Sequence, residues 1–320
     1  MVSRTQKKIL LAIDGSDQSL NAVRYVSKLL ASQKPELVLF YVMRKIDETF
    51  WDLGIAPAYH ERVADVSAWE LEQEKTVQGF MNYASQILLE AGIPEESVTA
   101  KIHERKAGVA RDIIKESMNG YSGVVVGRKG LSKLKDFLLG SVAHKLVEKL
   151  RHVSVWVVGG TPQLGRILLA LDGSEGAMKA VDHVGTMLGG LDYEVTLLHV
   201  MREVNWLICQ KKREDYIPSE LEASLEEKWL EDERLEMEPI FDEARIRLIN
   251  AGFDPNRVTT KLIRGVSSRA GGIVEEAKLG GYGSIVVGRR GLSRVEEFFM
   301  GRVSNKVVHL AKDMAVWVVS

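Results

Sequence analysis

Short runs of consecutive apolar residues alternate along this chain with longer segments in which apolar residues recur every three or four positions. The short runs are typical of buried β-strands, and the longer segments are typical of amphipathic helices. Every position of Val124–Val126 and Ile285–Val287 is apolar, which indicates strands buried on both faces, as in a parallel sheet covered by helices. In the first half, the expected strands are 9–13, 38–42, 98–102, 123–126 and 153–158, and the expected helices are 17–32, 61–91, 108–118 and 140–150. This alternation predicts an α/β fold with a doubly wound, Rossmann-like parallel sheet.

The second half of the chain repeats the first. The run ILLAIDGS at 9–16 returns as ILLALDGS at 167–174, and the closing runs at 155–158 and 316–319 both read VWVV. A repeat of about 160 residues has the size of a whole domain, whereas a solenoid unit is much shorter. We therefore expect two tandem domains of one fold, at residues 1–160 and 165–320.

Composition and charge narrow the classes of function. The 43 Lys and Arg residues nearly balance the 44 Asp and Glu residues, so no overall field attracts nucleic acid or an anionic membrane. No apolar run approaches the roughly 20 residues of a membrane span, and the run before Asp14 is too short for a signal peptide. The single Cys209 suits a reducing compartment. We expect a soluble, cytoplasmic protein that binds neither nucleic acid nor membrane.

A glycine pattern follows the same apolar strand in both halves. Gly127, Gly130 and Gly140 precede Ser141 in the first half, and the same spacing recurs 161 positions later in the second (288 minus 127). Glycines let a loop turn its backbone N–H groups toward one point, and the N-terminus of the next helix favours an anion. Arg128 could add charge from the loop. The alternative is that the glycines only shape tight turns, but their combination with the strand, the serine and the helix favours a phosphate site.

These motifs resemble the universal stress protein family, whose signature Gly-x2-Gly-x9-Gly-(Ser/Thr) is satisfied by Gly127 to Ser141. The Asp-Gly-Ser after the first strand and the Tyr41-Val42 pair after the second also resemble the family's landmarks. The resemblance implies an adenine nucleotide as ligand; we expect ATP, with Mg²⁺ bridging its phosphates. It implies adenosine contacts for Asp14 and Val42, and a ribose and phosphate path along the glycine segment. The implied binding residues of the first domain are Ala12, Asp14, Val42, Gly127, Arg128, Gly130, Gly140, Ser141 and Val142.

Asp14 has two open interpretations. A carboxylate directly after a strand can cap the helix that follows, because the first helical N–H groups need an acceptor. On the resemblance, it contacts ribose or adenine instead. Asp172 stands in the same setting in the second half.

The second half departs from the signature at one position, where Arg302 replaces the Ser/Thr. Arg302 either grips phosphate bidentately or marks a site that is lost. Ser304 or Asn305 could restore a donor. We expect ATP to bind mainly in the first domain, at about one site per chain. The weaker equivalents in the second domain are Asp172, Val200, Gly288, Gly291, Gly301, Arg302 and Val303.

No general base, nucleophile or metal-ligand spacing is evident beside the glycine segments, and the histidines at 103, 144, 152 and 309 form no ligand set. This favours a nucleotide-responsive binding or regulatory protein without a metal site. The alternatives are a slow ATP-hydrolysing or adenylyl-transfer enzyme, and a structural pseudo-dimer without nucleotide. The closing strands 153–158 and 315–319 are expected to pair and to form an intramolecular pseudo-dimer, because each would otherwise expose a sheet edge. A homodimer is left open.

Overall fold

The computed structural model describes residues 7–44, 60–130, 139–202, 219–291 and 300–320. The chain divides into two compact units, Met1–Lys149 and Leu150–Ser320. Cys209 lies outside the described residues.

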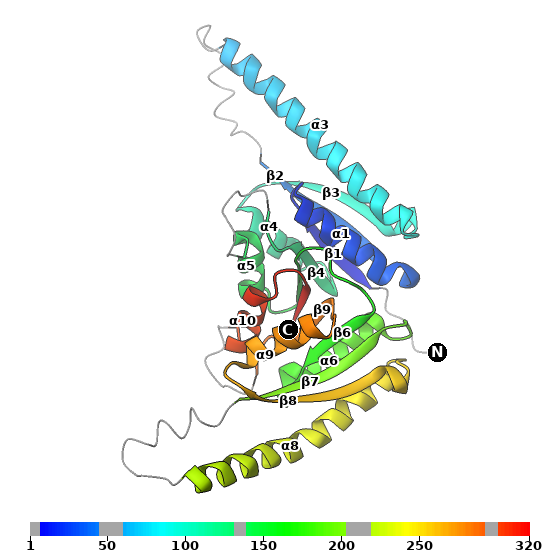
Figure 1. Cartoon of the computed structure of the whole chain (residues 1–320). Coiled ribbons are helices and arrows are strands. Elements are labelled where there is room, and N and C mark those ends of the chain that lie inside the picture. The colour runs from blue at the N-terminus through cyan, green and yellow to red at the C-terminus, as the bar shows by residue number, and fades with distance from the viewer. Residues whose placement is uncertain (1–6, 45–59, 131–138, 203–218, 292–299) are drawn as a thin grey trace. The chain divides into compact units, whose positions relative to one another are not determined.

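The first unit is a parallel sheet with the strand order β3-β2-β1-β4. Helices α1 and α3 pack together, as do α4 and α5, so that helices flank the sheet (Figure 1). Short 3-10 turns lie at Ala31–Gln33 and Glu95–Ser97. The elements are β1 (Lys8–Ile13), α1 (Asp17–Leu30), β2 (Glu36–Met43), α3 (His60–Glu90), β3 (Val98–Glu104), α4 (Val109–Glu116), β4 (Gly123–Gly127) and α5 (Ser141–Lys149).

Among the described residues, the second unit repeats this plan with six strands, two more than the first. Its strand order is β5-β10-β9-β6-β7-β8, and all neighbours are parallel except β5 and β10. A 3-10 turn lies at Pro255–Arg257. The elements are β5 (Ser154–Val158), β6 (Arg166–Ala170), α6 (Glu175–Leu188), β7 (Glu194–Arg202), α8 (Ser219–Asn250), β8 (Val258–Val266), α9 (Arg269–Leu279), β9 (Ser284–Gly288), α10 (Arg302–Leu310) and β10 (Ala315–Val319).

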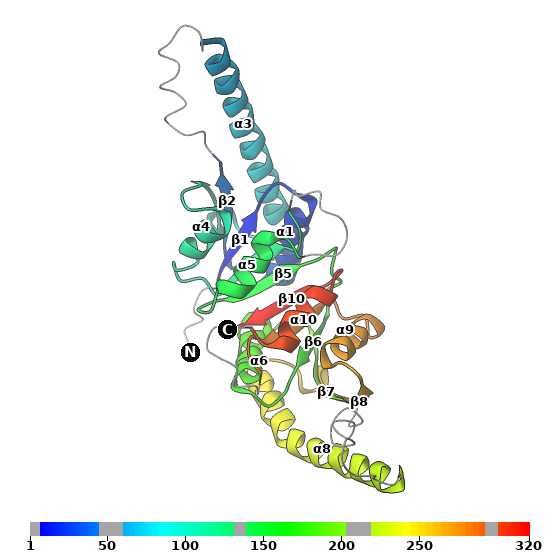
Figure 2. The same cartoon turned by 90° about the vertical axis from the view of Figure 1, so that its left-hand side faces the viewer.

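The predicted pairing of the closing strands is confirmed. Strands β5 and β10 are antiparallel, with Trp156 directly opposite Trp317 (Figure 2). The two indole rings are stacked with centroids 3.9 Å apart, and both side chains are fully buried. Trp156 Nε1 donates a hydrogen bond to Nε2 of the partly buried His183 on α6 over 3.1 Å. The closing strand of the first repeat is therefore part of the sheet and the core of the second unit.

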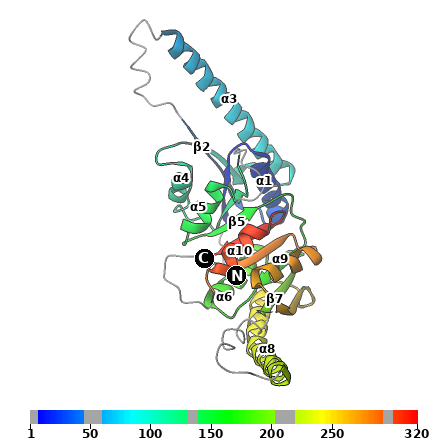
Figure 3. The same cartoon turned by 60° about the vertical axis from the view of Figure 1, so that its left-hand side comes forward.

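The apolar pattern places the core as the sequence predicts. Strands β4 and β9 are buried along their whole length, as expected for strands covered on both faces. Among the side chains that the structure describes, helices α3 and α8 bury one apolar seam in their C-terminal parts. Helix α8 extends beyond the sheet (Figure 3). Earlier on these helices Trp69 and Trp229, which are equivalent in the repeat, are about half exposed. None of the described helices is long and apolar enough to cross a membrane.

Candidate functional site

In the first domain, a cavity of about 210 Å³ opens where β1 and β4 end. The apolar side chains of Val109 and Ile113 from α4 contribute to its wall, and Lys129 brings a positive charge. Val42 does not line this cavity, and Arg128 is buried in the protein instead of facing it. The other residues named from the sequence meet there: Ala12, Asp14, Gly127, Gly130, Gly140, Ser141 and Val142.

The Asp14 carboxylate organises the turn after β1. Its Oδ1 accepts from the Ser16 backbone N–H over 3.1 Å and from the Ser16 hydroxyl over 2.6 Å. The N-cap of α1 is Ser16, whose hydroxyl oxygen accepts from the Ser19 N–H over 3.2 Å. Asp14 therefore does not cap the helix itself but holds the serine that does. The same bonds join Asp172 to Ser174 in the second domain, with the same lengths.

The glycine segment is folded tightly against this turn. The Gly140 N–H donates to the Arg128 carbonyl over 2.8 Å, and the equivalent bond from Gly301 to Arg289 measures 2.9 Å. A Cβ at Gly127 would lie 2.8 Å from backbone atoms of Gln18, and a Cβ at Gly130 would collide with Asp14 Oδ2. The glycines thus shape the loop, as the simpler interpretation holds, and this shape also brings the loop to the Asp14 carboxylate.

We expect Gly130→Ala to displace the Asp14 side chain, because the new methyl group would occupy the position of Oδ2. Loss of the two bonds to Ser16 should cost about 1 kcal/mol of unfolding free energy, and ligand binding should weaken more than about 10-fold. Denaturant unfolding and calorimetric titration measure the two effects. The matched control is Gly79→Ala on α3, where the methyl group meets open space and should stabilise the helix by about 0.5–1 kcal/mol. Unchanged ligand affinity in Gly130→Ala would show that the position of the Asp14 side chain does not matter for ligand binding.

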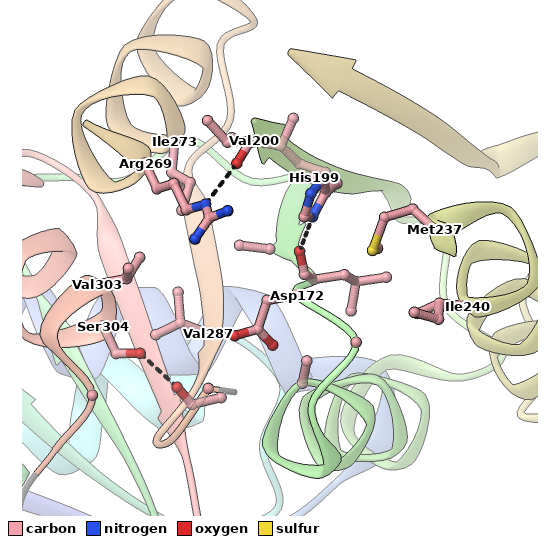
Figure 4. Close-up of a pocket in the computed structure, with 18 of the residues that line it drawn as sticks. Asp172, His199, Val200, Met237, Ile240, Arg269, Ile273, Val287, Val303 and Ser304 are labelled. Carbon is pink, nitrogen blue, oxygen red and sulfur yellow. Dashed lines mark hydrogen bonds between the residues drawn. The ribbon is translucent and has the colours of Figure 1, made fainter. Parts of the chain in front are cut away.

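The second-domain cavity is larger, at about 420 Å³ (Figure 4). Apolar side chains from α8, α9 and β9 line it, among them Met237, Ile240, Ile273 and Val287. Arg302 also lines it, in the first turn of α10. All seven predicted equivalents meet there: Asp172, Val200, Gly288, Gly291, Gly301, Arg302 and Val303.

The Ser304 hydroxyl does not restore the donor that Ser141 offers in the first domain. It is buried and donates to the Gly288 carbonyl oxygen over 2.6 Å, so its proton is already used within the protein (Figure 4). Asn305 does not line this cavity, so Arg302 provides the side-chain donor in the first turn of this helix.

A polar cluster that the sequence analysis missed stands in the wall of the second cavity. The Glu233 carboxylate Oε1 lies 2.9 Å from His199 Nε2 and 3.2 Å from Arg269 Nη2. Arg269 Nε donates to the Val200 carbonyl over 3.1 Å. Three elements contribute to this cluster, namely β7, α8 and α9. Glu233 lies among many acidic residues of α8, so only the comparison of the two halves could have singled it out.

Both ring nitrogens of His199 face acceptors. Nδ1 lies 2.8 Å from the Leu171 carbonyl oxygen and Nε2 faces the Glu233 carboxylate. In the first domain Tyr41 occupies the equivalent position, and burial together with the nearby Asp14 charge raises the pKa of its hydroxyl.

Asp112 fixes the loop before α4 next to the first cavity. Burial alone would raise the pKa of this carboxyl, but the backbone N–H groups of Lys106, Ala107 and Gly108, at 3.0, 3.1 and 3.3 Å, lower it below its ordinary value of 3.8. A lowered folded-state pKa means that the ionised carboxylate stabilises the fold above the unfolded-state pKa. This contribution is lost as the pH falls through the folded-state pKa.

We expect Asp112→Asn to lower the unfolding free energy at pH 7 by about 1–3 kcal/mol, because an amide cannot accept from all three N–H groups. The difference from wild type should stay constant down to about pH 4 and shrink below it, as followed by denaturant unfolding at several pH values. The control is Asp254→Asn in an exposed turn, where one N–H at 2.8 Å is involved and a smaller change is expected. Equal losses in both variants would refute this role of Asp112.

The fold and the site together define a class: tandem doubly wound α/β domains, each with an Asp-Gly-Ser turn and a glycine segment at one cavity. The model of the Universal stress protein family matches residues 5–159 and 164–320. The chain therefore belongs to the universal stress protein family, with two such domains in tandem.

Known proteins agree with this assignment. Universal stress protein YxiE of Bacillus subtilis (strain 168) is 32% identical over 142 residues, covering 43% of this chain and 90% of that protein. A universal stress protein from Archaeoglobus fulgidus DSM 4304 has a similar structure, with a TM-score of 0.63, 18% identity, and coverage of 100% of this chain and 99% of that chain. A functionally unknown protein from Pseudomonas aeruginosa PAO1 gives a TM-score of 0.54 at 15% identity, covering 99% and 93% of the two chains. These structures support the fold over the full length of the chain.

Proposed function

We propose that this protein binds ATP, mainly in its first domain, and acts as a nucleotide-responsive regulatory protein of the stress response. The observation that carries the proposal is the convergence of Asp14, Lys129, the glycine segment and Ser141 on one cavity. The first turn of α5 offers N–H groups and a helix dipole to an anion, and Ser141 and Lys129 add a hydroxyl and a charge. The apolar side chains of α4 suit the adenosine part.

A magnesium ion fits this arrangement as a companion of the phosphates. Mg²⁺ is bound through one or two carboxylates, phosphate oxygens and retained water, and Asp14 is the carboxylate among the described residues that line the first cavity. The ion would supply charge neutralisation between the phosphates. Asp14 would hold it from the turn after β1.

Regulation by occupancy is favoured over turnover. Catalysis of phosphoryl transfer needs a residue that positions the nucleophile. Asp14 already accepts two hydrogen bonds from Ser16, and the described lining of this cavity offers no nucleophile paired with a base. We propose that bound ATP changes the shape or the association of the protein.

Identification of the nucleotide tests the proposal. Purified full-length protein is denatured, the released small molecules are identified, and the emptied protein is titrated with ATP and Mg²⁺ in a calorimeter. We expect an adenine nucleotide and a micromolar Kd, about −8 kcal/mol. Protein that carries no nucleotide and ignores ATP would favour a structural role, and turnover above about 1 s⁻¹ would favour an enzyme.

A further inference from the structure

The two cavities differ most where the second strand of each domain ends. Arg269 of the second cavity corresponds to Val109 of the first. Each is the first residue of its helix, α9 or α4, and the two lie 160 positions apart (269 minus 109). Glu233 corresponds by the same offset to Gln73. The second domain has thus gained a cation and a carboxylate together, and they are hydrogen-bonded to each other over 3.2 Å.

Arg269 changes the hydrogen-bonding character of this end of the cavity. The Val200 carbonyl oxygen is an acceptor at the end of β7, and Arg269 Nε donates to it over 3.1 Å. The guanidinium points into the cavity, between His199 and Val287 (Figure 4). Without Arg269, the Val200 carbonyl would offer an acceptor to a ligand. With Arg269 bound to it, this end of the cavity offers the N–H donors of the guanidinium instead.

The side chains of the cluster hold one another in place. Glu233 Oε1 is shared by Arg269 and by His199, whose two ring nitrogens both face acceptors. The Glu233 carboxylate thus lies between the Arg269 guanidinium and the buried ring of His199. A fixed guanidinium loses little conformational entropy when it binds a second partner.

The opposite end of the same cavity suits an anion. Arg302 and the first N–H groups of α10 lie there, next to the glycine segment. Between the two ends, Met237 and Ile240 on one side and Ile273 on another form an apolar slot for a planar ring. A nucleotide placed by these features has its phosphates at α10 and the polar edge of its base at Arg269 and Glu233.

We propose that the second-domain cavity binds a 6-oxopurine nucleotide, a guanine or hypoxanthine nucleotide, in preference to an adenine nucleotide; this inference rests on the proposed nucleotide function. A 6-oxopurine presents the acceptors O6 and N7 to Arg269, the pairing that arginine makes with guanine, and its N1–H is a donor for Glu233. Adenine has an amino group in place of O6, which leaves two donors facing each other. A site built to hydrogen-bond a group rejects the analogue that lacks it.

The test is calorimetric titration of the full-length protein with GTP, ITP and ATP, each with Mg²⁺. We expect GTP and ITP to bind one site at least about 10-fold more tightly than ATP binds that site. ITP is the decisive probe, because it keeps O6 and N1–H but lacks the 2-amino group of guanine. ITP that behaves like ATP would overturn the recognition of O6 by Arg269.

Two variants test whether Arg269 and Glu233 cause the preference for 6-oxopurine nucleotides. Arg269→Val installs the residue of the first domain and should lower GTP and ITP affinity about 10-fold while ATP gains at this site. Glu233→Gln should reduce the same preference by removing the carboxylate. The matched control Arg245→Val removes an exposed arginine of α8 that binds the Pro255 carbonyl and does not line the cavity, and it should change none of these affinities. Thermal unfolding of each variant verifies that it is folded.

The outcomes separate this inference from the proposed function. If ATP binds at one site while GTP and ITP bind nowhere, or if Arg269→Val leaves the preference unchanged, the inference is wrong and ATP binding in the first domain stands. If none of the three nucleotides binds, both are wrong.

Discussion

Replacement of Trp156 by alanine is expected to lower the free energy of unfolding by about 3–5 kcal/mol, the range for deleting a large buried aromatic side chain. Trp156 is fully buried, stacks on Trp317 with centroids 3.9 Å apart, and donates to His183. The variant would lose the stacking contact, leave a cavity between β5 and β10, and leave the His183 acceptor without its donor. Denaturant unfolding measures the loss.

Trp69→Ala is the matched control. Trp69 is 52% exposed on α3, so the same chemical truncation should change the unfolding free energy by no more than about 0.5 kcal/mol. Trp317→Ala should lower the unfolding free energy by a similar amount to Trp156→Ala. The double variant should lower it by less than the sum of the two, because both single variants already lose the same stacking contact. Equal effects of Trp156→Ala and Trp69→Ala would show that the pairing of the closing strands contributes little.

His183 adds a pH-dependent signature to this experiment. Burial lowers the pKa of His183 to about 4, so the folded protein keeps the ring neutral where the unfolded chain, with a pKa near 6.5, already takes up a proton. Stability should therefore fall as the pH drops from about 6.5 toward 4. In Trp156→Ala, water can reach the ring and the fall should be shallower.

The fold could be predicted from the sequence because its signals are local. Fully apolar runs such as Val124–Val126 predict buried strands, and the duplicated VWVV ends predict the antiparallel pair found at β5 and β10. The glycine segments line the two cavities, because their spacing and the adjoining strand and helix fix where the backbone turns.

Side-chain roles that depend on distant elements could not be predicted. Arg128 looks like a loop cation in the sequence, yet it is buried away from the cavity, while its neighbour Lys129 lines it. The Asp-Gly-Ser motif does not reveal that Ser16 caps the helix and Asp14 holds the serine. Arg269 and Glu233 are 36 residues apart and meet only because α8 and α9 both pack at the end of β7. Such contacts come from tertiary packing and have no periodic signature.

Ser141→Arg is expected to weaken ATP binding to the first domain by about 10- to 150-fold. The substitution removes a hydroxyl that would donate to a charged phosphate, a bond worth about 1.5–3 kcal/mol, and it places the residue of the second domain in the first turn of α5. Calorimetric titration with ATP and Mg²⁺ measures the change, and wild type should give about one site per chain. Ser141→Ala separates the two causes, because it removes the hydroxyl without adding a long cation.

Two further variants make this prediction specific. Thr76→Arg also replaces a hydroxyl residue by arginine, but on the exposed face of α3, so it should leave ATP binding unchanged. Arg302→Ser gives the second domain the serine of the signature, yet stoichiometry should stay near one, because Arg269 still presents donors at the base end of that cavity. A rise to two sites in Arg302→Ser would show that Arg302 in the first turn of α10, and not the cluster at the end of β7, decides which nucleotide the second domain accepts. Two ATP sites in wild type would show that neither of them excludes ATP.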